Sequence, residues 1–316
     1  MDLLTDVITV MRAGRTQSAR VAWHAPWGQR FAAVPGAAGF QVVLQGSCWL
    51  IPTAANPIPL EAGDVVFLPH GREHALADSP ATALTSEACD PNDPHFTQRH
   101  AAATADAGSV TVTLCGAYQL DPARAHPLLF TLPEIIHLAA GPGQHPRLRT
   151  AVELLSAELE QPGLGADAAI PALLDTLLVY MLRTWIENKP GNTSGGWAAA
   201  LNDPPVTAAL YAIHRDTAHP WTVAGLAARA GLSRAAFARR FTRLVGQPPL
   251  TYLTWWRMTT AARLLCDTTA PLHTIAAEVG YTSEFAFAAA FKRTHGAPPG
   301  HYRRAALTRR QPGRTR

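Results

Sequence analysis

Two segments of this 316-residue chain share one pattern, which constrains the fold more than any other feature of the sequence. TVAGLAARAGLSRAAFARRFTRLVG (222–246) and LHTIAAEVGYTSEFAFAAAFKRTHG (272–296) each place a short apolar helix before a glycine, a serine and a longer helix. Gly231 and Gly280, 49 residues apart, are expected to make left-handed helix exits, and the serines to cap the helices that follow. Two helices joined by so short a turn form a helix-turn-helix, whose second helix enters the major groove of DNA. The chain therefore predicts a duplicated DNA-reading unit.

The charge distribution agrees with nucleic-acid binding. Residues 205–316 hold 16 Arg and Lys against 4 Asp and Glu, a net charge of +12, whereas residues 1–204 carry a net charge of −8. A basic segment attached to an acidic remainder is typical of a DNA-binding domain joined to a domain with another role.

Helical spacing separates the core face of each reading helix from its DNA face. Phe237 and Phe241, like Phe287 and Phe291, are four residues apart, so each pair points into its own bundle. The opposite faces predict the DNA-binding residues, which are Ser233, Arg234, Ala235, Ala238, Arg239 and Thr242 in the first unit and Ser283, Glu284, Phe285, Ala288, Ala289, Lys292 and Arg293 in the second.

The two reading helices differ in what they offer to DNA. Arg239 can make a bidentate contact to guanine, with phosphate binding or simple solvation as the alternatives. In the second helix, Glu284 can accept from cytosine and the alanines can touch thymine methyl groups, but little else there can hydrogen-bond a base. We therefore expect the first unit to supply most of the sequence specificity, and the second to supply phosphate anchoring and shape readout.

The stretch from LSRAAFARRF through GQPPLTYLTWWRMTTAARLL to IAAEVGYTSEFAFAAAFKRTHGAPPGHYRR resembles the AraC/XylS family of bacterial transcription regulators, over residues 205–304. The resemblance implies one long helix, here Pro249 to Leu265, between two units that read successive major grooves about 34 Å apart. It also implies double-stranded promoter DNA and RNA polymerase as partners, and an activator rather than a repressor.

The N-terminal part predicts a β-barrel. Residues 20–120 read as short strands separated by Gly and Pro. GDVVFLPHGREH resembles the second motif of the cupins, with Gly63, Pro69, Gly71 and His74 in place. The positions that would supply the other metal ligands hold Ala33, Pro35 and Gly39, which cannot coordinate a cation. We therefore expect a sensing barrel with no metal and no cofactor, and keep a metal-dependent cupin enzyme as the least favoured alternative.

Two sensing mechanisms are open for the barrel. In the first, an unidentified small-molecule effector enters a cavity lined by aromatic and polar residues, for which the candidates are Gln41, Trp49, Phe67, His74 and Cys115, with Phe40 beside them. In the second, Cys48 or Cys115 reacts with an oxidant or electrophile when its thiolate is stabilised.

The chain as a whole predicts an α+β multidomain protein, with a cupin-like barrel and a helical hairpin before an all-α domain that holds two helix-turn-helix units. The expected boundaries are 1–140 for the sensing domain, 141–188 for the hairpin, 189–204 for a linker, 205–304 for the DNA-binding domain and 305–316 for a basic disordered tail. The hairpin serves either as a homodimer contact or as packing onto the barrel.

The expected location is the cytoplasm, with no membrane contact. The N-terminal MDLLTDVITV is acidic where a secretory signal is basic, and the apolar run 172–186 is short and interrupted by charge.

Overall fold

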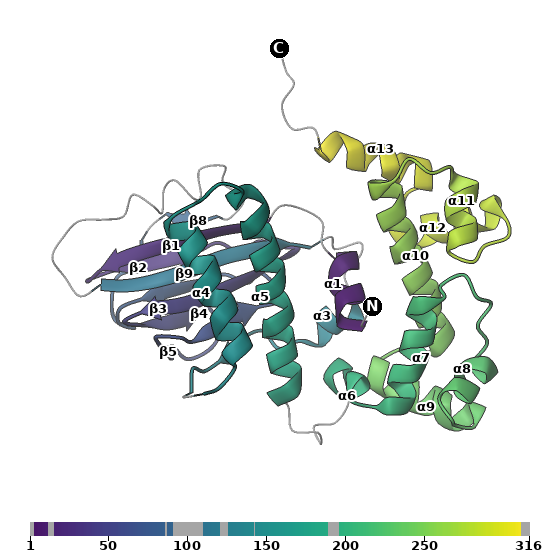
Figure 1. The fold of residues 1–316 in the computed structure, drawn as a ribbon, viewed down its shortest axis with the longest axis horizontal. Coiled ribbons are helices and arrows are strands. Elements are labelled where there is room, and N and C mark those ends of the chain that lie inside the picture. Colours follow the sequence, from purple (N-terminus) through teal and green to yellow (C-terminus); the bar gives the residue numbers. More distant parts are fainter. Residues whose placement is uncertain are drawn as a thin grey trace, which may run out of the picture. The chain divides into compact units, whose positions relative to one another are not determined.

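The computed structural model describes residues 3–11, 16–85, 87–90, 110–120, 126–141, 143–188 and 196–310. The chain divides into two compact units. The barrel unit comprises residues 12–121 and 132–189, and the helical unit comprises residues 1–11, 122–131 and 190–316. An α+β protein with a β-rich N-terminal part and an all-helical C-terminal part is confirmed (Figure 1).

The barrel unit is built from two five-stranded sheets. The first has the order β1 (Gln17–His24), β9 (Val110–Gln119), β3 (Ala37–Gln45), β6 (Val65–Leu68) and β10 (Ile136–Leu138). The second has the order β5 (Ile58–Glu61), β4 (Ser47–Pro52), β7 (His74–Ala77), β2 (Gly28–Phe31) and β8 (Ala88–Cys89). Neighbouring strands are antiparallel, except that β2 and β8 are parallel.

The core of the barrel unit follows the two-residue period of its strands. Val21, Val43 and Val66 come from the first sheet and Leu50 and Leu76 from the second, and all five belong to one buried cluster. Because successive side chains point to opposite faces of a sheet, the residues between these positions face outward from that cluster.

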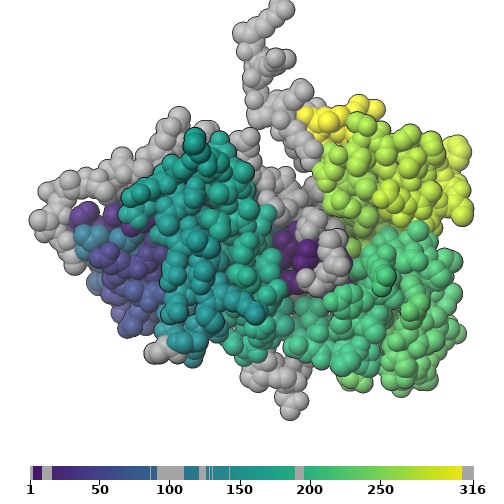
Figure 2. All heavy atoms as spheres, viewed as in Figure 1, coloured from purple at the N-terminus to yellow at the C-terminus, as the bar shows by residue number. Residues whose placement is uncertain are grey.

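Helices α4 (Pro146–Glu160) and α5 (Ala166–Asn188) form the expected hairpin and cover the first sheet. The Tyr118 hydroxyl, on β9, donates a hydrogen bond of 2.8 Å to the carbonyl of Leu174 on α5. Figure 2 shows the teal atoms of the two helices as a continuous layer on this side of the unit. These contacts bury part of the hairpin's apolar surface against the barrel. Packing onto the barrel is one of the two roles expected for the hairpin, and a homodimer contact is the other.

Helix α5 is longer than the apolar run seen in the sequence. With 23 residues, it is long and apolar enough to cross a membrane by length and composition alone. Core helices of globular proteins pass the same test, and Leu174, Leu177, Leu178 and Met181 of α5 are buried within the structure. We therefore assign α5 to the core of the barrel unit.

The helical unit combines two short N-terminal segments with the C-terminal helices. It contains α1 (Leu3–Met11), α3 (Pro127–Thr131), α6 (Trp197–Leu201), α7 (Pro204–Arg215), α8 (Val223–Arg229), α9 (Arg234–Val245), α10 (Pro249–Asp267), α11 (Leu272–Glu278), α12 (Glu284–His295) and α13 (Pro299–Arg310). The first two helices lie within the stretch that the sequence assigns to sensing, yet their contacts group them with the DNA-reading helices.

The structure differs from the sequence-based expectations for the linker (189–204) and for the C-terminal tail (305–316). The expected linker contains α6, whose Trp197 is buried, although residues 189–195 lie outside the described part. Residues 305–310 continue α13, so the expectation of disorder beginning at residue 305 is wrong for these positions. Residues 311–316 lie outside the described part.

Candidate DNA-binding interface and barrel pocket

The two helix-turn-helix units repeat the same backbone chemistry. Gly231 and Gly280 have φ values of +66° and +79°, and each is followed by a hydrogen bond that closes back onto the preceding helix. The hydroxyls of Ser233 and Ser283 each accept a 3.3 Å hydrogen bond from the backbone N–H three residues later, as expected for helix N-caps. The turn has one residue between Gly231 and its serine, and two between Gly280 and its serine. The two turns therefore share the glycine exit and the serine cap and differ in length by one residue.

Each reading helix buries its phenylalanines and exposes the opposite side. Phe237, Phe241, Phe287 and Phe291 are fully buried. Most of the thirteen predicted DNA-binding residues are exposed, the partly buried exceptions being Ala238 and Ala288. The structure thus brings the predicted residues together on the outer face of α9 and on the outer face of α12.

Two neighbouring arginines of α9 have different surroundings. Arg240 binds the carboxylate of Asp203 through Nε at 2.8 Å and Nη2 at 2.6 Å. Asp203 also caps α7 by accepting a hydrogen bond from the N–H of Val206. Arg239 is exposed and makes no hydrogen bond or ion pair with any described residue. Arg240 therefore joins α9 to α7, whereas the side chain of Arg239 is exposed on the outer face of α9.

On α12, the aromatic side chain of Phe285 is 90% exposed. It lies one residue after Glu284 in the first turn of the helix, and Lys292 and Arg293 are exposed in the last turns. An exposed aromatic ring at the start of a reading helix provides an apolar surface of the kind that contacts thymine methyl groups.

A buried polar cluster in the helical unit was missed by the sequence analysis. The Tyr252 hydroxyl of α10 lies 3.2 Å from Nε2 of His126 and 2.7 Å from Nε2 of His214 on α7. Nδ1 of His214 lies 3.3 Å from the carboxylate of Asp6 on α1. Trp256 stacks on the His214 ring at 3.6 Å. The cluster therefore ties α1, α7, α10 and the segment that contains His126 into one unit.

The donor and the acceptor of each hydrogen bond in this cluster can be assigned. Burial lowers the pKa of both histidines and raises that of Tyr252, so all three side chains are neutral near pH 7. A carboxylate only accepts, so Nδ1 of His214 donates to Asp6 and its Nε2 accepts from the Tyr252 hydroxyl. The hydroxyl in turn accepts from Nε2–H of His126. Each of these hydrogen bonds therefore has one donor and one acceptor.

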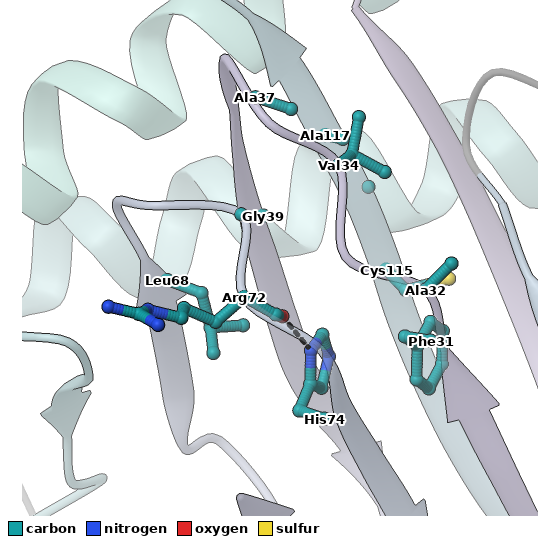
Figure 3. Close-up of a pocket in the computed structure, with 12 residues that line it drawn as sticks. Phe31, Ala32, Val34, Ala37, Gly39, Leu68, Arg72, His74, Cys115 and Ala117 are labelled. Carbon is teal, nitrogen blue, oxygen red and sulfur yellow. Dashed lines mark hydrogen bonds between the residues drawn. The ribbon is translucent and has the colours of Figure 1, made fainter. Parts of the chain in front are cut away.

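A small pocket opens in the barrel unit. Its cavity volume is about 40 Å³. The lining residues are Phe31, Ala32, Val34, Ala37, Gly39, Leu68, Gly71, Arg72, His74, Cys115, Gly116 and Ala117 (Figure 3). Most of them are apolar or glycine, and two of the five effector candidates, His74 and Cys115, are among them.

The other effector candidates lie elsewhere. Gln41 is buried behind His74, with its Nε2 3.0 Å from Nε2 of the histidine. Phe67 pairs with Phe40 on the face of the first sheet opposite the Val66 and Leu68 side chains. Trp49 lies between Cys48 and Leu50, which point into the core, so its ring is directed away from it. None of these three candidates lines the pocket.

His74 is held as one neutral tautomer. Its Nδ1 lies 3.1 Å from the carbonyl of Arg72, which only accepts, so Nδ1 carries the proton. Its Nε2 then accepts from the Gln41 amide. The ring stacks on Phe31 with centroids 4.9 Å apart. Burial lowers the pKa of His74 to about 4. Both ring nitrogens are thus occupied, which leaves no lone pair for a metal in this arrangement.

The depressed pKa of His74 predicts a loss of stability in mild acid. Below pH 6.5 the unfolded chain binds a proton at this site that the folded chain does not bind until about pH 4, so stability falls as the pH falls through this window. His74 alone is expected to contribute a loss of about 2 kcal/mol between pH 7 and pH 5. Urea unfolding of the wild type and of His74→Gln at both pH values measures the difference, and an equal loss in the two proteins would contradict it.

Both candidate sensor thiols are buried and protonated. Burial raises the pKa of Cys48 and of Cys115 to about 12. Cys115 Sγ lies 3.6 Å from the carbonyl of Ala19, to which the thiol donates. Reactive cysteines need a stabilised thiolate and access to solvent. The geometry therefore does not favour the thiol mechanism.

Comparison with known proteins assigns the chain to a family. Residues 2–187 match the Cupin family model, and residues 226–305 match the model described as a helix-turn-helix domain. A protein of Streptomyces lividans named "Putative AraC-like transcription regulator" is 36% identical over 96% of this chain and 98% of its own length. The protein belongs to the AraC family of transcription regulators.

Two further proteins are similar to most or to part of this AraC-family protein. The "RCS-specific HTH-type transcriptional activator RclR" of Escherichia coli (strain K12) is 30% identical over 84% of this chain and 83% of its own length. The DNA-binding domain of AdpA, solved in complex with a target DNA, is 35% identical and covers 35% of this chain and 99% of that chain, with a TM-score of 0.33. The AraC-family assignment makes this chain a helix-turn-helix DNA-binding protein with a cupin domain. It also indicates a regulatory rather than an enzymatic role.

Proposed function

We propose that this AraC-family regulator acts in the cytoplasm, binds promoter DNA through the outer faces of α9 and α12, and activates transcription when its barrel binds a small molecule. One observation carries the proposal. The two helices share glycine exits, serine caps and buried phenylalanines, and both expose the residues predicted for DNA binding. Two equivalent exposed helices joined by α10 can each enter one of two successive major grooves of DNA.

The two helices divide the reading of DNA between them. Arg239 is exposed and unpaired within the described residues, so it can make a bidentate contact to a guanine. Phe285 and the small side chains of α12 offer apolar contact to thymine methyl groups, and Lys292 and Arg293 offer phosphate contacts. Sequence specificity therefore comes mainly from α9, with anchoring from α12.

The barrel unit supplies the signal rather than catalysis. His74 is neutral and both of its ring nitrogens are hydrogen-bonded, so it is neither a base nor a metal ligand in this arrangement. Effector binding must favour one arrangement of the protein over another to change transcription. RNA polymerase is the expected partner for activation.

A homodimer through the hairpin is part of the same proposal. Leu154 on α4 is 54% exposed and Leu164, in the turn after α4, is fully exposed. These leucines provide an apolar contact for a second copy. Sedimentation of the wild type and of Leu154→Glu tests this contact, and an unchanged monomer content would contradict it.

The DNA-reading assignment is tested by comparing two adjacent arginines. A preferred site is first selected from random duplexes, and affinities for that site and for an unrelated duplex are then measured by fluorescence anisotropy at one salt concentration. Arg239→Ala is expected to lower affinity for the selected site by about 1–3 kcal/mol, with a much smaller effect on the unrelated duplex.

Arg240→Ala is the matched control. It removes the contact to Asp203, so it should lower thermal stability while preserving the ratio of the two affinities. If Arg239→Ala weakens binding to both duplexes equally, Arg239 contacts only phosphate and the base-reading role is wrong.

A further inference from the structure

The barrel pocket lacks an available charge, which limits the molecules it can hold. Arg72 is the only lining residue with a permanent charge, and its Nε and Nη2 contact the carboxylate of Glu134 at 2.7 and 2.9 Å. Figure 3 shows its side chain pointing away from His74 and Phe31. Among the residues described, the lining therefore presents no unpaired charge to a ligand.

The polar groups of the lining are also occupied. Both ring nitrogens of His74 are hydrogen-bonded, one to the carbonyl of Arg72 and one to the Gln41 amide. The Cys115 thiol points to the carbonyl of Ala19. A bound carboxylate or polyol would lose its water without gaining partners from these side chains, which is unfavourable. An uncharged apolar group loses little on leaving water and gains contact with Phe31, Val34 and Leu68.

The pocket is narrow because a glycine in its lining lets two backbone segments approach closely. A Cβ at Gly71 would overlap the carbonyls of Val34 and Ala37. Gly39 differs, because a Cβ there would meet Leu68 at 3.7 Å and the Gly116 carbonyl at 3.9 Å, which are ordinary contacts. The pocket thus admits a slender group, and Gly39 is the position from which it can be filled.

We propose that the barrel pocket binds the alkyl chain or single ring of a small uncharged molecule, and that charged and polyhydroxylated molecules are excluded. The inference rests on the proposed sensing function for its biological meaning, but binding can be measured independently of DNA. The neutral, stacked His74 and Phe31 rings form one wall, and Leu68 and Val34 contribute apolar side chains beside the glycine backbone.

The test uses two probes of equal chain length that differ in charge. Pentan-1-ol and pentanoate are titrated into the full chain, and binding is followed by the NMR methyl signals of Leu68 and Val34. We expect pentan-1-ol to bind at least about tenfold more tightly than pentanoate, because the carboxylate finds no unpaired cation. Glycerol at the same concentrations should leave the signals unchanged.

Filling the pocket provides the second measurement. Gly39→Val adds bulk inside the pocket and is expected to weaken pentan-1-ol binding at least about tenfold. Ala22→Val is the control, because Ala22 lies between the core residues Val21 and Trp23 on β1 and points to the other face of the sheet. It should bind pentan-1-ol as the wild type does.

Three outcomes would overturn the ligand class. Pentanoate could bind as tightly as pentan-1-ol, glycerol could compete with it, or Gly39→Val could bind it unchanged. The sensing role is judged separately, by the affinity of the full chain for its selected DNA site with and without pentan-1-ol. If the probe binds in the pocket and DNA affinity and reporter output do not change, the ligand class stands and the proposed sensing role is contradicted.

Discussion

Tyr252→Phe is expected to destabilise the helical unit by about 2–4 kcal/mol, although it removes a single oxygen atom. That oxygen lies in a fully buried side chain and accepts from His126 while donating to His214. Without it, two imidazole nitrogens, one of them in the fully buried His126, lose this hydrogen-bond partner at once. The cost of leaving buried polar groups unpaired exceeds the small gain from a less polar ring.

Tyr211→Phe is the matched control. Tyr211 lies on α7 in the same unit and is 42% exposed, so its hydroxyl is hydrated in both states and its removal should change stability by less than about 0.5 kcal/mol. Thermal and urea unfolding of the three proteins, followed by circular dichroism at the helical signal, measures both effects. Equal stability of Tyr252→Phe and Tyr211→Phe would show that the hydrogen bonds through Tyr252 contribute nothing net.

The Tyr252 cluster also shows which contacts of the helical unit sequence reasoning could not find. The sequence signals of helix-turn-helix units are local: a glycine exit, a serine cap and two phenylalanines four residues apart. These were read correctly, since Gly231, Ser233 and Phe237 each have the predicted conformation, cap or burial. Asp6 and His126 join the same unit across more than a hundred residues, and no short pattern records such a contact.

In the barrel, strand positions were predictable, but the direction of side chains was not. FQVVLQG and DVVFLP are short apolar runs bounded by Gly and Pro, which identifies strands, yet they do not say which alternate set of side chains faces the other sheet. Phe40 and Phe67 were expected at a cavity, and they lie on the opposite face of their sheet from Val66. His74 was found because the cupin-like motif fixes its place, whereas its neutral tautomer depends on Gln41 and on the Arg72 carbonyl.

Gly280→Ala is expected to cost about 3–4 kcal/mol, the second large effect on the helical unit. Gly280 has a φ of +79°, a conformation that costs an alanine about 1 kcal/mol or more. Its new Cβ would also lie 2.6 Å from the carbonyl oxygen of Ala218, which belongs to the backbone and cannot rotate away. The same Cβ would meet the guanidinium of Arg257, which binds the carbonyls of Thr217 and His219 at 2.9 and 2.8 Å. Relief of the overlap therefore requires loss of these hydrogen bonds.

Gly231→Ala separates backbone strain from steric overlap. Gly231 occupies the equivalent turn of the first unit with a φ of +66°, and a Cβ there would meet nothing within 4 Å. Its substitution should cost about 1 kcal/mol, from the left-handed conformation alone. Urea unfolding of both variants gives the difference, expected at about 2–3 kcal/mol because only the second unit packs its turn against Ala218 and Arg257. Equal losses in the two variants would mean that the loop from Thr217 to His219 yields without cost, and that Arg257 does not hold the second turn in place.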